Sequence, residues 1–208
     1  MRSISRFLLF LPVMLLIAGP DMATVVQPGY TLLDSYTNLT EGSVVVVGRV
    51  IDVHNVEIER HQGQVRVYPE IEIDIEECLY GGVTGTIKIL GLNTFVHQNG
   101  QWLIRATGGA PWLVPGDRVL VKARQSELKS TTLGLTLFYR LRTASFLLDS
   151  QPLVENQLYE YTGFAPSVDL QDKAGVLTPV GILESAKRNA IPLELTIADI
   201  LRSIRASK

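Results

Sequence analysis

Asp52 and His54 are the two residues whose types and spacing come closest to catalytic chemistry. They lie two positions apart in a strand-like segment, so their side chains share one face of that strand. A carboxylate beside an imidazole can orient a base that activates a nucleophile. The chain has no Gly-x-Ser-x-Gly turn to supply a nucleophilic serine. Because this nucleophile is missing, a hydrolase of unknown substrate is only an alternative function. We expect the protein to have no catalytic residues.

The histidines and acidic residues form no pattern typical of a metal site. The histidines lie in three separate segments: His54, His61 and His97. A zinc site needs at least three converging ligands. Acidic residues alternate along one strand: Glu70, Glu72, Asp74 and Glu76. Neighbouring carboxylates there are about 6.6 Å apart and point the same way, so they do not surround one calcium ion. We expect no metal, no other cofactor, and a solvated acidic face opposite Lys88 or Arg118; a surface for a metal ion or a cationic partner is the alternative.

Aromatic and glycine residues in the middle of the chain mark a candidate binding surface. Six residues make it up: Phe95, Trp102, Gly108, Gly109, Pro111 and Trp112. Aromatic side chains beside glycine-rich loops are common where proteins bind a sugar or a peptide. The glycines lack the following Gly-Lys-Ser/Thr of a phosphate-binding loop. The alternative is that they only let the chain turn tightly before Trp112 packs.

The first residues have the composition of a secretory signal peptide. Arg2 and Arg6 precede an apolar run that ends at Ala18. This run is shorter than the roughly twenty apolar residues that span a bilayer. We expect residues 1–18, or alternatively 1–23, to be removed, and the mature protein to be secreted or periplasmic with no stable membrane span. An uncleaved leader would tether it to the membrane.

The composition predicts a domain that folds around its own core. Hydrophobic residues are 46% of the chain, and its formal net charge is −2. Nucleic-acid binding needs a clustered cationic surface, so DNA and RNA are not expected partners. Cys78 is the single cysteine, so no disulfide within the chain can stabilise the fold. We expect Cys78 to be a small buried apolar residue.

Strand patterns fill the middle of the chain. Residues 44–47 are β-branched, as in a strand buried on both faces, and the alternation changes phase after Gly48, which predicts a bulge. Residues 65–76 alternate strictly, and Pro69 among them predicts an edge or a bulge. Further strands are expected over residues 85–90, 118–124 and 133–148. About five strands with turns at regular spacing predict a small barrel or sandwich.

Helices are expected on both sides of these strands. Thr31 and Asp34 have the spacing of a capping box and begin a short helix within residues 30–39. Thr196 begins a C-terminal helix in the same way, with Asp199 three residues later. Its apolar residues recur on one face: Ile197, Ile200, Leu201 and Ile204.

The segment between the strands and the C-terminal helix shows little periodicity. Residues 151–179 are expected to be irregular, and residues 181–189 match a short helix. The predicted organisation is therefore a signal peptide, a barrel domain over residues 30–149, and residues 150–208 as an irregular segment with a helix that packs on the barrel or extends it.

The strand block also resembles a group of exported bacterial domains. Residues 43–50 (SVVVVGRV) are similar to the group's opening strand, and residues 108–121 (GGAPWLVPGDRVLV) to a later block of it. That group is in turn similar to netrin-like modules and tissue inhibitors of metalloproteinases. The resemblance, over roughly residues 30–149, implies an OB-type barrel and, as an alternative function, a regulator or inhibitor of a secreted protease. The cysteine with which such inhibitors chelate zinc is missing here.

These patterns predict a mainly β protein: a small five-stranded OB-like barrel with a short N-terminal helix and a C-terminal helix. We expect an exported, non-catalytic binding domain. Its expected partner is a protein or a component of the cell envelope.

Overall fold

The computed structural model describes most of the chain after residue 30. The described residues are 31–60, 64–98, 101–105, 111–130, 134–150, 156–162, 167–173, 176–182 and 188–206. They form two helices and eleven strands: α1 (Leu32–Thr37), β1 (Ser43–Arg60), β2 (Gln64–Tyr80), β3 (Thr86–Leu90), β4 (Thr94–Gln98), β5 (Gln101–Arg105), β6 (Arg118–Ser130), β7 (Gly134–Phe146), β8 (Gln157–Thr162), β9 (Ser167–Lys173), β10 (Val176–Ile182), β11 (Asn189–Thr196) and α2 (Ile197–Ala206). The predicted leader, residues 1–18, lies outside them.

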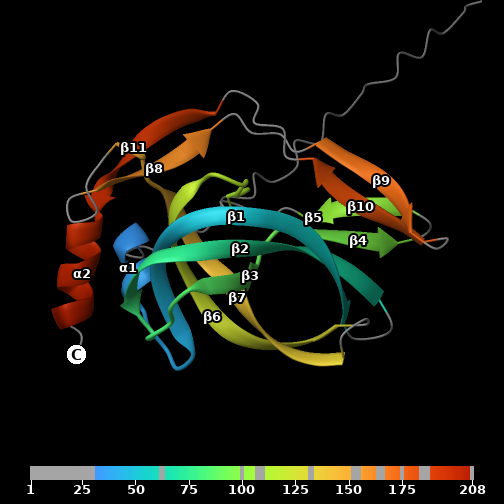
Figure 1. The fold of residues 1–208 in the computed structure, drawn as a ribbon, viewed down its shortest axis with the longest axis horizontal. Helices are drawn as coiled ribbons and strands as arrows, with labels where there is room; N and C mark the ends of the chain where they lie inside the picture. The colour runs from blue at the N-terminus through green and yellow to red at the C-terminus, as the bar shows by residue number, and fades with distance from the viewer. Residues whose placement is uncertain are drawn as a thin grey trace, which may run out of the picture. The chain divides into compact units, whose positions relative to one another are not determined.

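Five strands close into a barrel in the order β1-β2-β3-β7-β6-β1 (Figure 1). β2 is antiparallel to β1 and β3, β3 is parallel to β7, and β6 is antiparallel to β7. β6 returns to β1, where Ser43 lies opposite Arg124. The predicted fold class, a mainly β protein with a five-stranded barrel and two helices, is confirmed.

The barrel interior is filled by the apolar residues whose alternation predicted the strands. Its buried members are Val44, Val46, Val50, Ile71, Ile73, Ile87, Ile89, Leu113, Val119, Val121, Ala123, Leu141 and Phe146. Burial of each such side chain stabilises the fold by about 1.5–3 kcal/mol before the entropy of ordering is subtracted. This packed interior leaves the outer faces of the strands to carry binding sites.

Bulges bend β1 and β2 around the core, as the change of phase in β1 predicts. The pairing of the two strands shifts between Val47 and Gly48 and again between Val50 and Asp52. Ile51 is the extra residue of the second shift, and its side chain is exposed. A Cβ at Gly48 would lie 2.3 Å from the Asp74 carbonyl oxygen, so only glycine allows this close approach of the two strands.

Pro69 lies where β2 changes its partner. From residue 70 onward β2 pairs with β3, whereas Arg66 and Val67 pair with β4. Pro69 pairs in register with Asn55 of β1, so the predicted bulge is not there; on its other side it lies between the pairings with β3 and β4, where its missing N–H is tolerated.

Both helices cover the outer face of β1 and β6, and they lie side by side (Figure 1). Each begins with the predicted capping box, Thr31 with Asp34 in α1 and Thr196 with Asp199 in α2. Their apolar faces form a second core on the outside of the barrel: Tyr36, Val45, Val47, Leu120, Leu147, Leu158, Leu195, Ile197, Ile200 and Ile204. The C-terminal helix therefore packs on the barrel.

Lys122 of β6 also holds α1 in place. Its Nζ donates to the carbonyl oxygens of Ser35 and Asn38 at the end of α1, and the residue is 6% exposed. Burial and the nearby Arg142 charge lower the pKa of Lys122. The carbonyl groups satisfy the buried ammonium.

The prediction of an irregular segment over residues 151–179 is wrong, because β8, β9 and most of β10 lie in it. β8 pairs with β7 through Tyr159 and Phe146, and with β11 on its other side. The expected helix over residues 181–189 is also wrong at its described ends, since Gly181 and Ile182 belong to β10 and Asn189 begins β11. These strands form by pairing with distant partners, which a short local pattern does not reveal.

β4 and β5 form a further hairpin, which extends the sheet beyond β2. Among the described residues, no helix has the length and apolar character needed to cross a membrane.

Candidate binding site

The residues of the predicted aromatic surface do not form one surface in the structure. Phe95 is buried, with its ring centroid 6.2 Å from that of the half-buried Trp112. Trp102 is also half-buried and lies beside His97, at 5.1 Å between ring centroids. Phe95 therefore offers no ring to a ligand. Gly108 and Gly109 lie outside the described residues.

Pro111, the remaining member of the predicted surface, lines a cavity of about 490 Å³ beside β7. Residues from α1, β7, β8 and β11 and from the segments before β4 and β6 enclose it: Leu32, Ser35, Leu92, Pro111, Leu141, Arg142, Thr143, Ala144, Ser145, Phe146, Glu160, Tyr161 and Leu193. We call it the β7 cavity. Its volume lies in the range of small-molecule and peptide side-chain sites, and its lining mixes apolar, polar and charged groups.

A bulge in β7 puts Arg142 at this cavity. Lys122 faces Thr143 and Ala123 faces Leu141, so Arg142 is one extra residue in the strand. Bulges are common beside functional sites because they re-aim a side chain. Arg142 is exposed, and no ion pair or hydrogen bond joins its guanidinium to the part of the chain that the structure describes. An anionic group entering the cavity would find this cation unneutralised.

Glu160 of β8 supplies the opposite charge in the same cavity. Its side chain is exposed, and it too makes no ion pair with a described residue. A cavity whose arginine and glutamate both lack an ion pair with any described residue can pair with both signs of charge on one ligand.

One wall of the cavity is held rigidly. The Arg188 guanidinium lies 4.6 Å from the Tyr161 ring centroid and donates two hydrogen bonds to the Asp117 carboxylate. Tyr161 in turn packs on Phe146, at 4.3 Å between ring centroids. Because Arg188 and Asp117 are both nearly buried, this charge-assisted pair fixes the aromatic wall.

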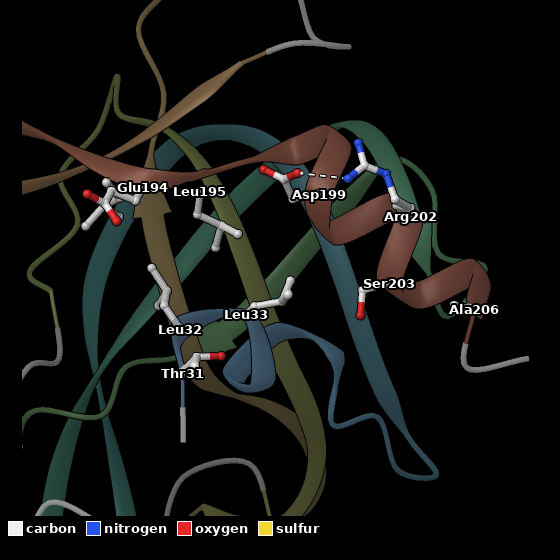
Figure 2. A pocket seen from close by; sticks show the side chains of 10 residues that line it. Thr31, Leu32, Leu33, Glu194, Leu195, Asp199, Arg202, Ser203 and Ala206 are labelled. Carbon is white, nitrogen blue, oxygen red and sulfur yellow. Dashed lines mark hydrogen bonds and ion pairs between the residues drawn. The ribbon is translucent and has the colours of Figure 1, made fainter. Parts of the chain in front are cut away.

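A second, more apolar groove of about 800 Å³ adjoins the cavity. It lies between α1, α2 and β11, and Figure 2 shows Leu32 and Leu33 of α1 facing Leu195 across it. We call it the helix groove. Leu32 and Leu193 line both the helix groove and the β7 cavity, so the two hollows meet there. Asp199 and Arg202, joined at 3.4 Å, stand at the rim of the helix groove (Figure 2).

The acidic strand face carries ion pairs with the predicted cations. Lys88 lies 2.5 Å from Glu72 and 3.3 Å from Glu70, and hydrogen bonds to Glu72 and Glu70 raise the pKa of Lys88. Arg118 pairs with Glu76 at 2.8 Å. The expectation of a wholly solvated face is wrong at Glu70, which is buried because β3 and His54 cover it.

Asp52 and His54 do lie together, as their spacing predicts. The His54 Nδ1 is 3.1 Å from Asp52, and its Nε2 is 3.2 Å from Glu70. A general base needs a ring nitrogen that can face a nucleophile, and here both nitrogens face carboxylates. The hydrolase stays a prediction that this geometry does not favour. Among the described residues, no three histidine, cysteine or acidic side chains converge as metal ligands do.

Arg142 and Glu160, the charged residues of the β7 cavity, do not appear in the sequence prediction. The sequence does hold a signal for the bulge, since the alternation of apolar residues changes phase between Leu141 and Phe146. Nothing local indicates that β8 and α1 would meet there. Comparison of the chain with protein-family models, with curated proteins and with solved structures finds no match.

Proposed function

We propose that this protein is an exported, non-catalytic binding domain that takes an extended segment of a partner protein into the β7 cavity and the helix groove. The observation that carries the proposal is Arg142, which a bulge directs to the β7 cavity without a partner among the described residues. An exposed charge at a cavity favours a complementary group on a ligand. The N-terminal leader supports export.

The two hollows differ in chemistry, and the difference favours a peptide. The β7 cavity offers Arg142 and Glu160, whereas the helix groove offers the half-buried Leu32 and Leu33 of α1. A segment with charged residues followed by apolar side chains would match both in turn. Apolar contacts then supply affinity, and the charge pairs supply specificity.

A photoreactive residue at the junction of the hollows tests this proposal. We replace Leu193 with benzoylphenylalanine and irradiate the protein in an extract of the cell envelope and in culture medium. The control carries the same residue at Ile51, which is also apolar and is more exposed than Leu193 but lines neither hollow. We expect one protein partner to be crosslinked from position 193 and not from position 51.

Reversing the charge of Arg142 distinguishes specific binding of the partner from nonspecific contact with apolar side chains. Arg142→Glu in the photoreactive variant should lower the crosslinked yield about tenfold, which corresponds to about 1.4 kcal/mol. Equal labelling from positions 193 and 51, or a yield that Arg142→Glu leaves unchanged, would show that the hollows do not bind the partner.

The export part of the proposal has its own test. Expression in a bacterial host with N-terminal sequencing of the exported protein should place the new N-terminus just after Ala18 or after Ala23. A protein that stays in the cytoplasm contradicts export, and an intact leader in the membrane fraction shows a tether.

A further inference from the structure

The sheet that contains the barrel has two free edges, and they differ in how well they are protected. β11 and β5 are the end strands of its order, so each pairs with a described strand on one side only. A free edge presents unpaired backbone groups to any other strand. Proteins protect such edges with proline and with charged side chains.

β11 carries both protections. Pro192 has no N–H, so it breaks the row of backbone donors along β11, and Glu194 is an exposed charge two residues later. β5, with the sequence QWLIR, has no proline and its one charge stands at its last residue. Leu103 and Ile104 are 44% and 46% exposed on its two faces. The described residues include four exposed large apolar side chains, and β5 holds two of them.

The sequence of β5 is complementary to itself in one antiparallel register. A two-fold axis at Leu103 pairs all five residues: Leu103 with Leu103, Trp102 with Ile104 and Gln101 with Arg105 of the other copy. In a two-fold symmetric pair of strands, opposed side chains lie on the same face of the sheet only if the register differs from this one by an even number of residues. Each of those alternative registers leaves some of the five residues without an opposite residue. This register opposes no like charges.

The cross-strand pairs in this register are favourable ones. Trp102 of each copy lies opposite Ile104 of the other copy, which gives two such pairs. Pairs of an aromatic with a β-branched residue stabilise a sheet. Both residues lie on the face of the hairpin that also carries His97, whose ring packs on Trp102. The paired hairpins would therefore share one apolar stripe across the two-fold axis.

We propose that two copies of this protein associate through β5, strand against strand, to form one continuous sheet. The inference does not rest on the proposed function, because β5 lines neither the β7 cavity nor the helix groove. Two five-residue strands bury less than the roughly 1,200 Å² of a standard stable interface, so the dimer is weak and depends on concentration.

Sedimentation equilibrium of the purified protein over micromolar to millimolar concentration tests the proposal. We expect a monomer–dimer equilibrium. Leu103→Lys should weaken the association about tenfold or more, because two ammonium groups then face each other at the axis. Ile191→Lys is the matched control: Ile191 is 42% exposed on the protected edge, so its substitution should leave the equilibrium unchanged.

A mixture of Leu103→Lys and Leu103→Glu tests the register itself. Each variant alone should be monomeric, and the mixture should form a heterodimer, since only this register opposes position 103 to itself. Leu103 is exposed, so both variants should fold, which circular dichroism checks. A monomeric wild type, or a dimer that Ile191→Lys disrupts as strongly as Leu103→Lys does, would overturn the proposal.

Discussion

Tyr36 shows how one side chain joins a helix to the barrel. It is completely buried under α1, and its hydroxyl lies 2.7 Å from the Ser145 Oγ and donates to the Leu120 carbonyl at 3.2 Å. The ring fills the second core while the hydroxyl satisfies groups on β6 and β7. Ser145 also lines the β7 cavity, so Tyr36 supports the candidate site from behind.

Tyr36→Phe should destabilise the protein by about 1 kcal/mol, since it removes the hydroxyl and keeps the ring. Urea unfolding measures this change. Burial raises the pKa of Tyr36, so the folded chain keeps the proton at a pH where the unfolded chain has lost it. The contribution of Tyr36 is therefore complete below pH 10, the ordinary tyrosine value, and declines as pH rises above it.

The comparison of wild type with Tyr36→Phe isolates this effect from the other tyrosines. The stability difference between the two proteins should depend on pH only on the alkaline side. Tyr36→Ala, which also removes the ring, should cost about 3–5 kcal/mol. A Phe variant with the stability of wild type at every pH would show that the hydroxyl contributes nothing.

At the scale of the elements, Arg188 attaches the start of β11 to the barrel. Its guanidinium reaches from the residue before β11 to Asp117 in the turn before β6, and it lies over the rings of Tyr161 and Phe146. The segment that the sequence leaves without a pattern is thereby fixed by contacts with distant residues. The wall of the β7 cavity depends on the same contacts.

Arg188→Met should destabilise the protein by about 3–5 kcal/mol, because it leaves the nearly buried carboxylate of Asp117 without its cation. Hydrogen exchange should become faster in β8 and β11 than in β1 and β2, whose pairing does not involve Arg188. Arg202→Met is the control, since its exposed ion pair is worth about 1 kcal/mol or less. Uniformly faster exchange in every strand would contradict a local role for Arg188.

At the scale of the whole molecule, stability comes from packing without covalent cross-links. Cys78 is half-buried beside the barrel core, and its thiol donates to the Tyr80 carbonyl at 3.3 Å. The expectation of a buried apolar residue is therefore correct only in part.

The urea unfolding midpoint should be the same with and without a thiol reductant, because a single cysteine forms no disulfide within the chain. Cys78→Ser should lower the stability modestly, since a hydroxyl replaces a partly buried sulfur. A midpoint that falls when reductant is added to the monomer would contradict this account.

Much of the fold could be predicted from local patterns. Alternation in residues 65–76, the phase change after Gly48 and the two capping boxes act over a few residues, and each matches the structure. The candidate site could not be predicted in this way. Arg142 reaches its cavity through a bulge, and Glu160 through a strand whose own pattern is too weak to identify it.

The sequence by itself therefore determined a mainly β domain with a barrel or sandwich core, the helices at its two ends and the absence of an internal disulfide, because periodicity and composition are local properties. Only the tertiary structure decided that residues 157–162, 167–173 and 176–182 are strands, that Glu70 is buried and that Leu32 and Leu193 join two hollows into one surface. The physical reason is that strand pairing and cavity formation depend on residues far apart in the chain, whose meeting no short window of sequence contains.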